Sequence, residues 1–150
     1  MEFNEVIKTR WSVRSFSDKK VEQDKLLRIL ETAKTAPTAK NMQPVRIICA
    51  QSDKALADFK RISPCTYGAP LIFAVCSDEN KCWVSSDGES RGEMDASIYA
   101  THIMLAAANE GLGSCWVCMF DRNELVRRFE LPENIVPRCL VVVGYPSEDA

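Results

Sequence analysis

The chain has 150 residues, of which 46% are hydrophobic and 27% are charged, and this is the composition of one ordinary globular domain over residues 1–150. The formal net charge of −2 at pH 7 gives no overall attraction to nucleic acid or to an acidic membrane. The acidic N-terminus carries no apolar signal segment, and no apolar run reaches about 18 residues. We therefore expect a cytoplasmic protein with no nucleic-acid or membrane partner.

Hydrophobic periodicity, caps and turn residues predict about five helices and about four short strands. The expected helices cover residues 2–8, 21–35, 52–61, 93–109 and 121–129. The expected strands cover residues 47–50, 71–76, 114–119 and 139–143. Helices and strands do not alternate strictly, so the simplest arrangement is an α+β fold in which a sheet lies between two layers of helices.

Two segments stand out within this pattern. Residues 78–92 form a polar loop of about 15 residues that contains the run Cys82–Val84, and a loop of that length with an embedded tryptophan is typical of a functional segment. Residues 93–109 are apolar nearly all round the helix, which places them in a core or at an oligomer interface. His102, the only histidine, shares a helical face with apolar neighbours, so we expect a core or interface side chain rather than a catalytic one.

Arg10, Ser12 and Arg14 place two guanidinium groups and a hydroxyl within five residues, just after the first expected helix. Guanidinium groups offer planar, paired donors to phosphate oxygens, and a serine hydroxyl adds a small donor between them. The cluster therefore favours an anion site. A solvated, charged turn between two helices is the alternative, and the cluster alone does not separate the two.

A polar run follows Pro37, which ends the second expected helix. Thr38, Asn41 and Gln43 supply hydroxyl and amide groups that donate and accept hydrogen bonds, as recognition of a flat heterocycle or a polyol chain requires. The same composition is typical of an ordinary loop, so a binding role depends on support from the rest of the chain.

The glycine-rich run at residues 111–116 follows a helix and precedes a strand. A dinucleotide-binding fingerprint needs a strand, then glycines, then a helix, so a Rossmann site is excluded. Gly111 and Gly113 either let the backbone approach a flat group or simply end the helix.

Cys115 and Cys118 form a C-x-x-C pattern on an expected strand. Residues three apart on a strand point to opposite faces, so we expect neither a metal site nor a disulfide at this pair. The seven cysteines are an odd number without a framework spacing, which is typical of buried, reduced thiols. A thiol-redox protein that uses this pair is the least favoured hypothesis.

The order and spacing of these segments resemble those of the FMN-dependent nitroreductase family over nearly the whole chain. The R-x-S-x-R run at residues 10–14 and the P-x-x-x-N-x-Q-P run at residues 37–44 carry the resemblance most specifically. Further matching pieces are residues 68–70, 95–107, 111–116 and 143–146. The resemblance implies a nitroreductase-like helix–sheet–helix sandwich with a mixed, mainly antiparallel sheet.

The resemblance also implies a homodimer with two FMN molecules at the subunit interface. Arg10 and Ser12 would hold the FMN phosphate. Arg14 would lie near the pyrimidine end of the flavin, where a cation stabilises the negative charge of the reduced ring.

Two further sets of residues complete the implied cofactor site. The backbone from residue 111 to 115 would line the other side of the flavin through Gly113, Ser114 and Cys115. One loop would reach the flavin bound to the opposite subunit, and its cofactor-binding residues are Pro37, Thr38, Asn41 and Gln43.

The implied activity is an oxidoreductase with ping-pong hydride transfer. NADH or NADPH delivers hydride and leaves, and a small electron-poor acceptor such as a nitroarene or a quinone takes its place. No catalytic residue is expected from the protein, because the cofactor carries the chemistry.

Family members commonly continue beyond a Gly-Tyr-Pro run, with a basic residue at the phosphate, whereas this sequence ends four residues after Pro146. That difference motivates one alternative, a non-catalytic flavin-binding or interaction protein on the same fold.

Overall fold

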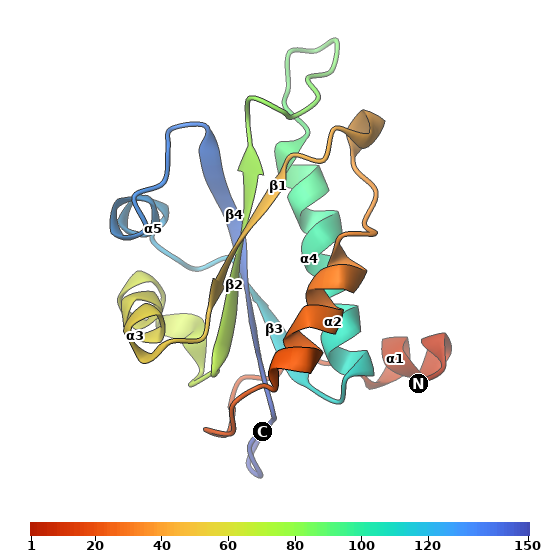
Figure 1. Cartoon of the computed structure of the whole chain (residues 1–150), viewed down its shortest axis with the longest axis vertical. Helices are drawn as coiled ribbons and strands as arrows, with labels where there is room; N and C mark the ends of the chain where they lie inside the picture. Colours follow the sequence, from red (N-terminus) through yellow and green to blue (C-terminus); the bar gives the residue numbers. More distant parts are fainter.

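The computed structural model describes all 150 residues as five helices, two short 3-10 turns and four strands (Figure 1). The helices are α1 (Phe3–Thr9), α2 (Gln23–Ala33), α3 (Asp53–Ile62), α4 (Gly92–Asn109) and α5 (Arg122–Arg128). The 3-10 turns are η1 (Ala39–Asn41) and η2 (Pro64–Thr66). The strands are β1 (Val45–Ala50), β2 (Leu71–Asp78), β3 (Gly113–Val117) and β4 (Ile135–Gly144).

The four strands form one sheet in the order β1-β2-β4-β3. Helices α2 and α4 cover one face of the sheet, and α3 and α5 cover the other (Figure 1). Each face buries its own core, with Phe73 and Ile103 in one and Phe59 and Leu125 in the other. The expected α+β helix–sheet–helix sandwich is confirmed. All pairings within the sheet are antiparallel, and the parallel component is a single bridge between Ser12 on a neighbouring segment and β3.

Local sequence signals explain most element boundaries. The buried residues of α2 recur at helical spacing. Helix α3 begins at Asp53 because the hydroxyl of Ser52 accepts a hydrogen bond from the backbone N–H of Ala55. Helix α5 begins in the same way, since the carboxylate of Asp121 accepts a hydrogen bond from the N–H of Glu124. Strand β2 is a continuous apolar run and is buried on both faces.

Strand β4 is longer than the sequence predicts, because it starts at Ile135 rather than at Cys139. The sequence pattern misses the first residues of this strand because they include Pro137, and proline is normally excluded from strand interiors. In the structure, Cys139 pairs with Val75, and Pro137 pairs with the next residue of β2. Arg138 is therefore the extra residue of a β-bulge, which accommodates the proline.

Helix α4 packs on the sheet through its buried alanines and Ile103. Helix α1 packs against α4 and buries Val6. Two apolar side chains of α1 remain in solvent, with Phe3 66% exposed and Ile7 48% exposed. None of the helices combines the length and hydropathy that a bilayer span requires.

The register of the sheet defines two opposite ends. At one end, Val45 at the start of β1 lies opposite Ser77 near the end of β2. At the other end, Gly113 at the start of β3 lies opposite Gly144 at the end of β4. Since β2 and β4 run in opposite directions, the length of the sheet separates these two pairs (Figure 1).

Candidate functional site

The segment that carries the predicted anion cluster lies directly against the start of β3. Ser12 forms a bridge with Ser114, and the N–H of Val13 donates a 3.0 Å hydrogen bond to the carbonyl of Ser114. A glycine is needed beside this contact, because a Cβ on Gly113 would lie 2.5 Å from Cγ2 of the buried Val13. The structure thus brings together two predicted sets of residues: Arg10, Ser12 and Arg14 with Gly113, Ser114 and Cys115.

Several polar groups at this junction have no partner within the chain. Neither Arg10 nor Arg14 forms an ion pair with a carboxylate. The guanidinium of Arg14 reaches the carbonyl of Ser12 at 3.4 Å and also lies beside the phenol of Tyr67. The hydroxyl of Ser114 is buried and has no hydrogen-bond partner. Two guanidinium groups without a carboxylate partner, on the segment that packs against a buried free hydroxyl, fit an anionic ligand.

A cleft of about 210 Å³ opens beside these groups. The lining includes Arg10, Trp11, Ser114, Pro146 and residues 111–113. The predicted site residues Ser12, Arg14 and Cys115 lie next to these in sequence but do not line the cleft. A guanidinium group and an indole ring beside two glycines suit a ligand that joins a flat ring system to a negative group. Sequence analysis missed Trp11 and Pro146 as lining residues. Trp11 lies inside the R-x-S-x-R run and is 47% exposed in the structure, so part of its indole ring is accessible from the cleft side.

Burial raises the pKa of the Cys115 thiol, and the charges of Arg14 and Arg10 offset that rise only in part. The thiol therefore stays protonated at neutral pH and is a poor nucleophile.

Strand β3 ends at Val117, two residues before the expected end at residue 119, so Cys118 lies beyond the strand and is exposed. All seven cysteines are free thiols, and no group of three or more His, Cys, Asp or Glu side chains could hold a metal ion.

The third predicted set lies in the loop between α2 and β1. Within and after η1, the backbones of Lys40, Asn41 and Gln43 are left-handed, with φ of 49°, 55° and 52°. The N–H of Gln43 donates a 3.0 Å hydrogen bond to the hydroxyl of Thr38 and closes the loop on itself. The amide side chains of Asn41 and Gln43 are exposed, and both remain free to bind a ligand.

Asp95 anchors this loop to the first turn of α4. Its Oδ1 accepts a 2.8 Å hydrogen bond from the N–H of Ala39, and the side chain is only 2% exposed. Its Oδ2 is buried without a partner. The positive end of the helix dipole stabilises a carboxylate in this position. Sequence analysis did not identify Asp95 as an anchor of this loop, because nothing local indicates a contact across 56 residues.

Within one chain, the structure does not bring the loop residues Pro37, Thr38, Asn41 and Gln43 to the cleft at β3. The loop leads into β1 at one end of the sheet, whereas Gly113–Cys115 lie at the other end (Figure 1). The two sets can contribute to one ligand site only if they come from two different chains.

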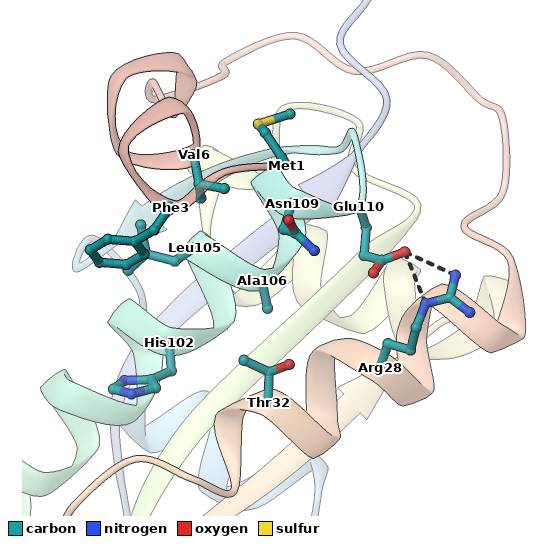
Figure 2. Close-up of a pocket in the computed structure, with 10 residues that line it drawn as sticks. All are labelled: Met1, Phe3, Val6, Arg28, Thr32, His102, Leu105, Ala106, Asn109 and Glu110. Carbon is teal, nitrogen blue, oxygen red and sulfur yellow. Dashed lines mark hydrogen bonds and ion pairs between the residues drawn. The ribbon is translucent and has the colours of Figure 1, made fainter.

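A second groove, of about 290 Å³, runs between α1, α2 and α4 (Figure 2). Phe3 reaches over it from α1, and the ion pair of Arg28 with Glu110 borders it at 2.9 Å (Figure 2). His102 lines the groove, and its Nδ1 lies 3.0 Å from the carbonyl of Ile98 in the same helix. The histidine therefore belongs to an apolar helix surface, away from the unpaired arginines.

Comparison with known proteins gives a consistent result. The model of the nitroreductase family matches residues 7–75 and 60–145. A crystal structure of a nitroreductase family protein from Clostridium difficile 630 is 38% identical, with 99% of this chain and 86% of that chain covered and a TM-score of 0.95. A Methanothermobacter thermautotrophicus protein, whose name pairs NADH dehydrogenase with NAD(P)H nitroreductase, is 32% identical over 99% of this chain and 80% of its own. The FMN reductase (NAD(P)H) of Bacillus subtilis is 29% identical over 97% of this chain and 67% of its own. The chain therefore belongs to the nitroreductase family.

Proposed function

We propose that the chain is a cytoplasmic, FMN-dependent NAD(P)H oxidoreductase that reduces nitroaromatics, quinones or similar electron-poor acceptors. The observation that carries this proposal is the cleft at β3, which is lined by the unpaired Arg10 and by Ser114, a residue whose buried hydroxyl has no hydrogen-bond partner. Membership of the nitroreductase family supports an oxidoreductase. The names of the relatives from Bacillus subtilis and Methanothermobacter thermautotrophicus support FMN and NAD(P)H as cofactor and electron donor.

In this proposal, the guanidinium of Arg10 and the hydroxyl of Ser12 bind the FMN phosphate. Arg14 lies nearer the pyrimidine end of the flavin, where its charge raises the reduction potential by stabilising the reduced, anionic ring. A Cβ at Gly113 would meet Val13 and Pro146, so the glycine keeps the arginine segment close to β3. The backbone of Gly113, Ser114 and Cys115 would line one side of the flat ring.

We also propose that the working unit is a homodimer, because the second set of binding residues lies at the far end of the sheet. The loop with Pro37, Thr38, Asn41 and Gln43 would then contact the FMN held by the opposite subunit. Helix α1 exposes the apolar side chains of Phe3 and Ile7. Phe3 borders the groove between α1, α2 and α4 (Figure 2), and we assign contact with a second subunit to this surface.

The chemistry that bound FMN supplies is acceptance of a hydride from NADH or NADPH and later transfer of two electrons to an acceptor, in a ping-pong cycle. A nitro group that gains two electrons and two protons becomes a nitroso group and releases water; one proton arrives with the hydride and the other comes from solvent. In this proposal, the protein binds the cofactor, orients the substrate beside it and shields both from water. Cys115 stays protonated and His102 lies in the other groove, so neither side chain serves as a base at the cleft.

Arg10→Ala and Ser12→Ala test the phosphate assignment. We expect both variants to retain the wild-type circular dichroism spectrum while the dissociation constant of FMN rises by about tenfold to a hundredfold, because a hydrogen bond to a charged group contributes about 1.5–3 kcal/mol. Arg61→Ala, which removes an exposed guanidinium from α3, is the matched control. Wild-type FMN content in both site variants would overturn the assignment.

Steady-state oxidation of NAD(P)H with a quinone acceptor separates an enzyme from a non-catalytic flavin-binding protein on the same fold. We expect turnover that depends on bound FMN. A protein that binds FMN at full occupancy and oxidises NADH and NADPH no faster than free FMN does would contradict the enzymatic proposal.

A further inference from the structure

Lys40 and Trp83 place an ammonium group beside an indole ring, next to the loop that we assign to the cofactor of the opposite subunit. The Nζ of Lys40 lies 5.6 Å from the centroid of the Trp83 ring, within the range of a cation–π interaction. Lys40 is exposed and forms no ion pair with a carboxylate, and Trp83 is only half-buried. Both groups therefore keep surface that a ligand can contact.

Trp83 stands at the base of a small hairpin within the segment between β2 and α4. Its carbonyl accepts a 3.0 Å hydrogen bond from the N–H of Arg91, and the adjacent Val84 forms a bridge with Ser90. The guanidinium of Arg91 pairs with Asp87 at 2.7 Å across the hairpin. These links give the hairpin a defined shape and hold the backbone of Trp83 in place.

The root of the hairpin is fixed to the sheet. Glu79, directly after β2, pairs with Arg138 of the β4 bulge at 2.7 Å. Cys82 is buried against the start of α4, where a Cβ on Gly92 would lie 2.6 Å from its Sγ. Trp83 directly follows Cys82, so its backbone lies between a buried side chain and the hydrogen bond to Arg91.

The backbone beside Lys40 is also held, because the neighbouring N–H of Ala39 donates to the buried carboxylate of Asp95. Both members of the pair thus stand on backbone that is hydrogen-bonded to the rest of the fold. Held backbone lowers the entropy cost of ordering the two segments when a ligand binds, and the remaining cost is that of the Lys40 side chain.

The chemistry of this pair matches a flat aromatic molecule that carries a negative group. An indole face stacks on an aromatic ring, and an unpaired ammonium attracts a carboxylate or a sulfonate. We propose that Lys40 and Trp83 form a specificity subsite that favours anionic aromatic acceptors, such as nitrobenzoates, over neutral ones. This inference rests on the proposed function, which places the loop of Lys40 at the flavin of the opposite subunit.

The test compares 4-nitrobenzoate with its neutral analogue 4-nitrobenzamide, using FMN-loaded protein at saturating NAD(P)H. We expect Lys40→Gln to lower the ratio of kcat/KM for the acid over kcat/KM for the amide by roughly twofold to fivefold, the range of a solvent-exposed ion pair. We expect Trp83→Leu to raise KM for both compounds by about threefold to tenfold, because both lose an aromatic contact. Lys54→Gln, which removes one exposed charge from α3, is the matched control and should leave the ratio unchanged.

A binding measurement gives a second readout that needs no turnover. Without NAD(P)H, quenching of tryptophan fluorescence by 4-nitrobenzoate gives its dissociation constant, which should be roughly twofold to fivefold weaker in Lys40→Gln than in wild type. The subsite would be overturned if Lys40→Gln left both the acid-to-amide ratio of kcat/KM and the dissociation constant unchanged. It would also be overturned if Lys54→Gln lowered that ratio as much as Lys40→Gln does. Neither result would contradict the proposed function. Failure of FMN-loaded wild type to reduce either compound or a quinone would contradict the proposed function, and the fluorescence titration would still decide whether the subsite exists.

Discussion

The N–H of Ala39 donates a 2.8 Å hydrogen bond to Oδ1 of Asp95, and this link ties the loop after α2 to the first turn of α4. The loop needs such support, because Lys40 and Asn41 adopt left-handed backbone conformations that are unfavourable for residues other than glycine. Since the carboxylate is 2% exposed, the link is shielded from competing water. The geometry of the predicted binding loop therefore depends on a residue far away in the sequence.

Asp95→Ala removes the acceptor and leaves the N–H of Ala39 without a partner. We expect the free energy of unfolding to fall by about 1–3 kcal/mol, the cost of an unsatisfied buried group, and FMN affinity to fall with it. Asp95→Asn keeps an acceptor oxygen in place and should retain most of the affinity. Urea denaturation and FMN fluorescence titration measure the two effects. Equal FMN affinity in Asp95→Ala and wild type would show that the loop does not depend on this anchor.

Gly113→Ala probes the close packing of the arginine segment on β3. A Cβ at this position would lie 2.5 Å from Cγ2 of Val13, so we expect a loss of about 1–3 kcal/mol in unfolding free energy from overpacking. Val13→Ala removes the clashing methyl group, so the double variant should be more stable than the sum of the two single effects predicts. Strict additivity in thermal or urea denaturation would argue against direct contact between the two positions.

Phe3→Asp tests the proposed homodimer. A charge among the exposed apolar side chains of α1 should disfavour association, and FMN occupancy should fall in parallel because the two halves of the site would come apart. Met119→Asp places the same charge on an apolar side chain that is also 66% exposed but lies after β3, and it should leave association unchanged. Sedimentation velocity reads the oligomeric state. A monomeric wild-type protein with full FMN occupancy would contradict the shared site.

Glu79 makes stability depend on pH. Burial alone raises the pKa of this carboxyl, but hydrogen bonds from Ser77, Ser90 and Arg138 outweigh burial and lower the pKa from 4.5 to about 2. Because the folded pKa lies below the unfolded one, the charged form stabilises the fold above about pH 4.5, and this stabilisation is lost as the pH falls toward about 2.

We therefore expect the difference in unfolding free energy between about pH 6 and about pH 3 to be smaller in Glu79→Gln than in wild type. Glu133→Gln changes an exposed side chain that forms no ion pair and serves as the control. Urea denaturation at both pH values gives the comparison. The same pH difference in Glu79→Gln and wild type would show that Glu79 is not the group responsible.

Local signals predicted most of the fold. Periodicity located the helices, the caps Ser52 and Asp121 marked two helix starts, and the apolar run of β2 was recognisable as a buried strand. The start of β4 was missed because Pro137 argues against a strand, and only the register with β2 shows that a bulge at Arg138 accommodates it.

Local sequence signals also predicted one part of the candidate site and missed the rest. Arg10, Ser12 and Arg14 are neighbours in sequence, so their clustering was visible from the sequence alone. Their contact with Ser114 and the anchoring of Ala39 by Asp95 join residues that are far apart in the chain. No local propensity encodes such contacts, because they form only when the sheet and α4 are assembled.

The most direct test of the central claim is the visible absorption spectrum of the purified protein, followed by identification and quantification of the cofactor released on denaturation. The cleft at Arg10 and Ser114 predicts a yellow protein that releases about one FMN per chain, consistent with a cofactor that carries the chemistry. A colourless protein that also fails to take up added FMN would contradict the claim.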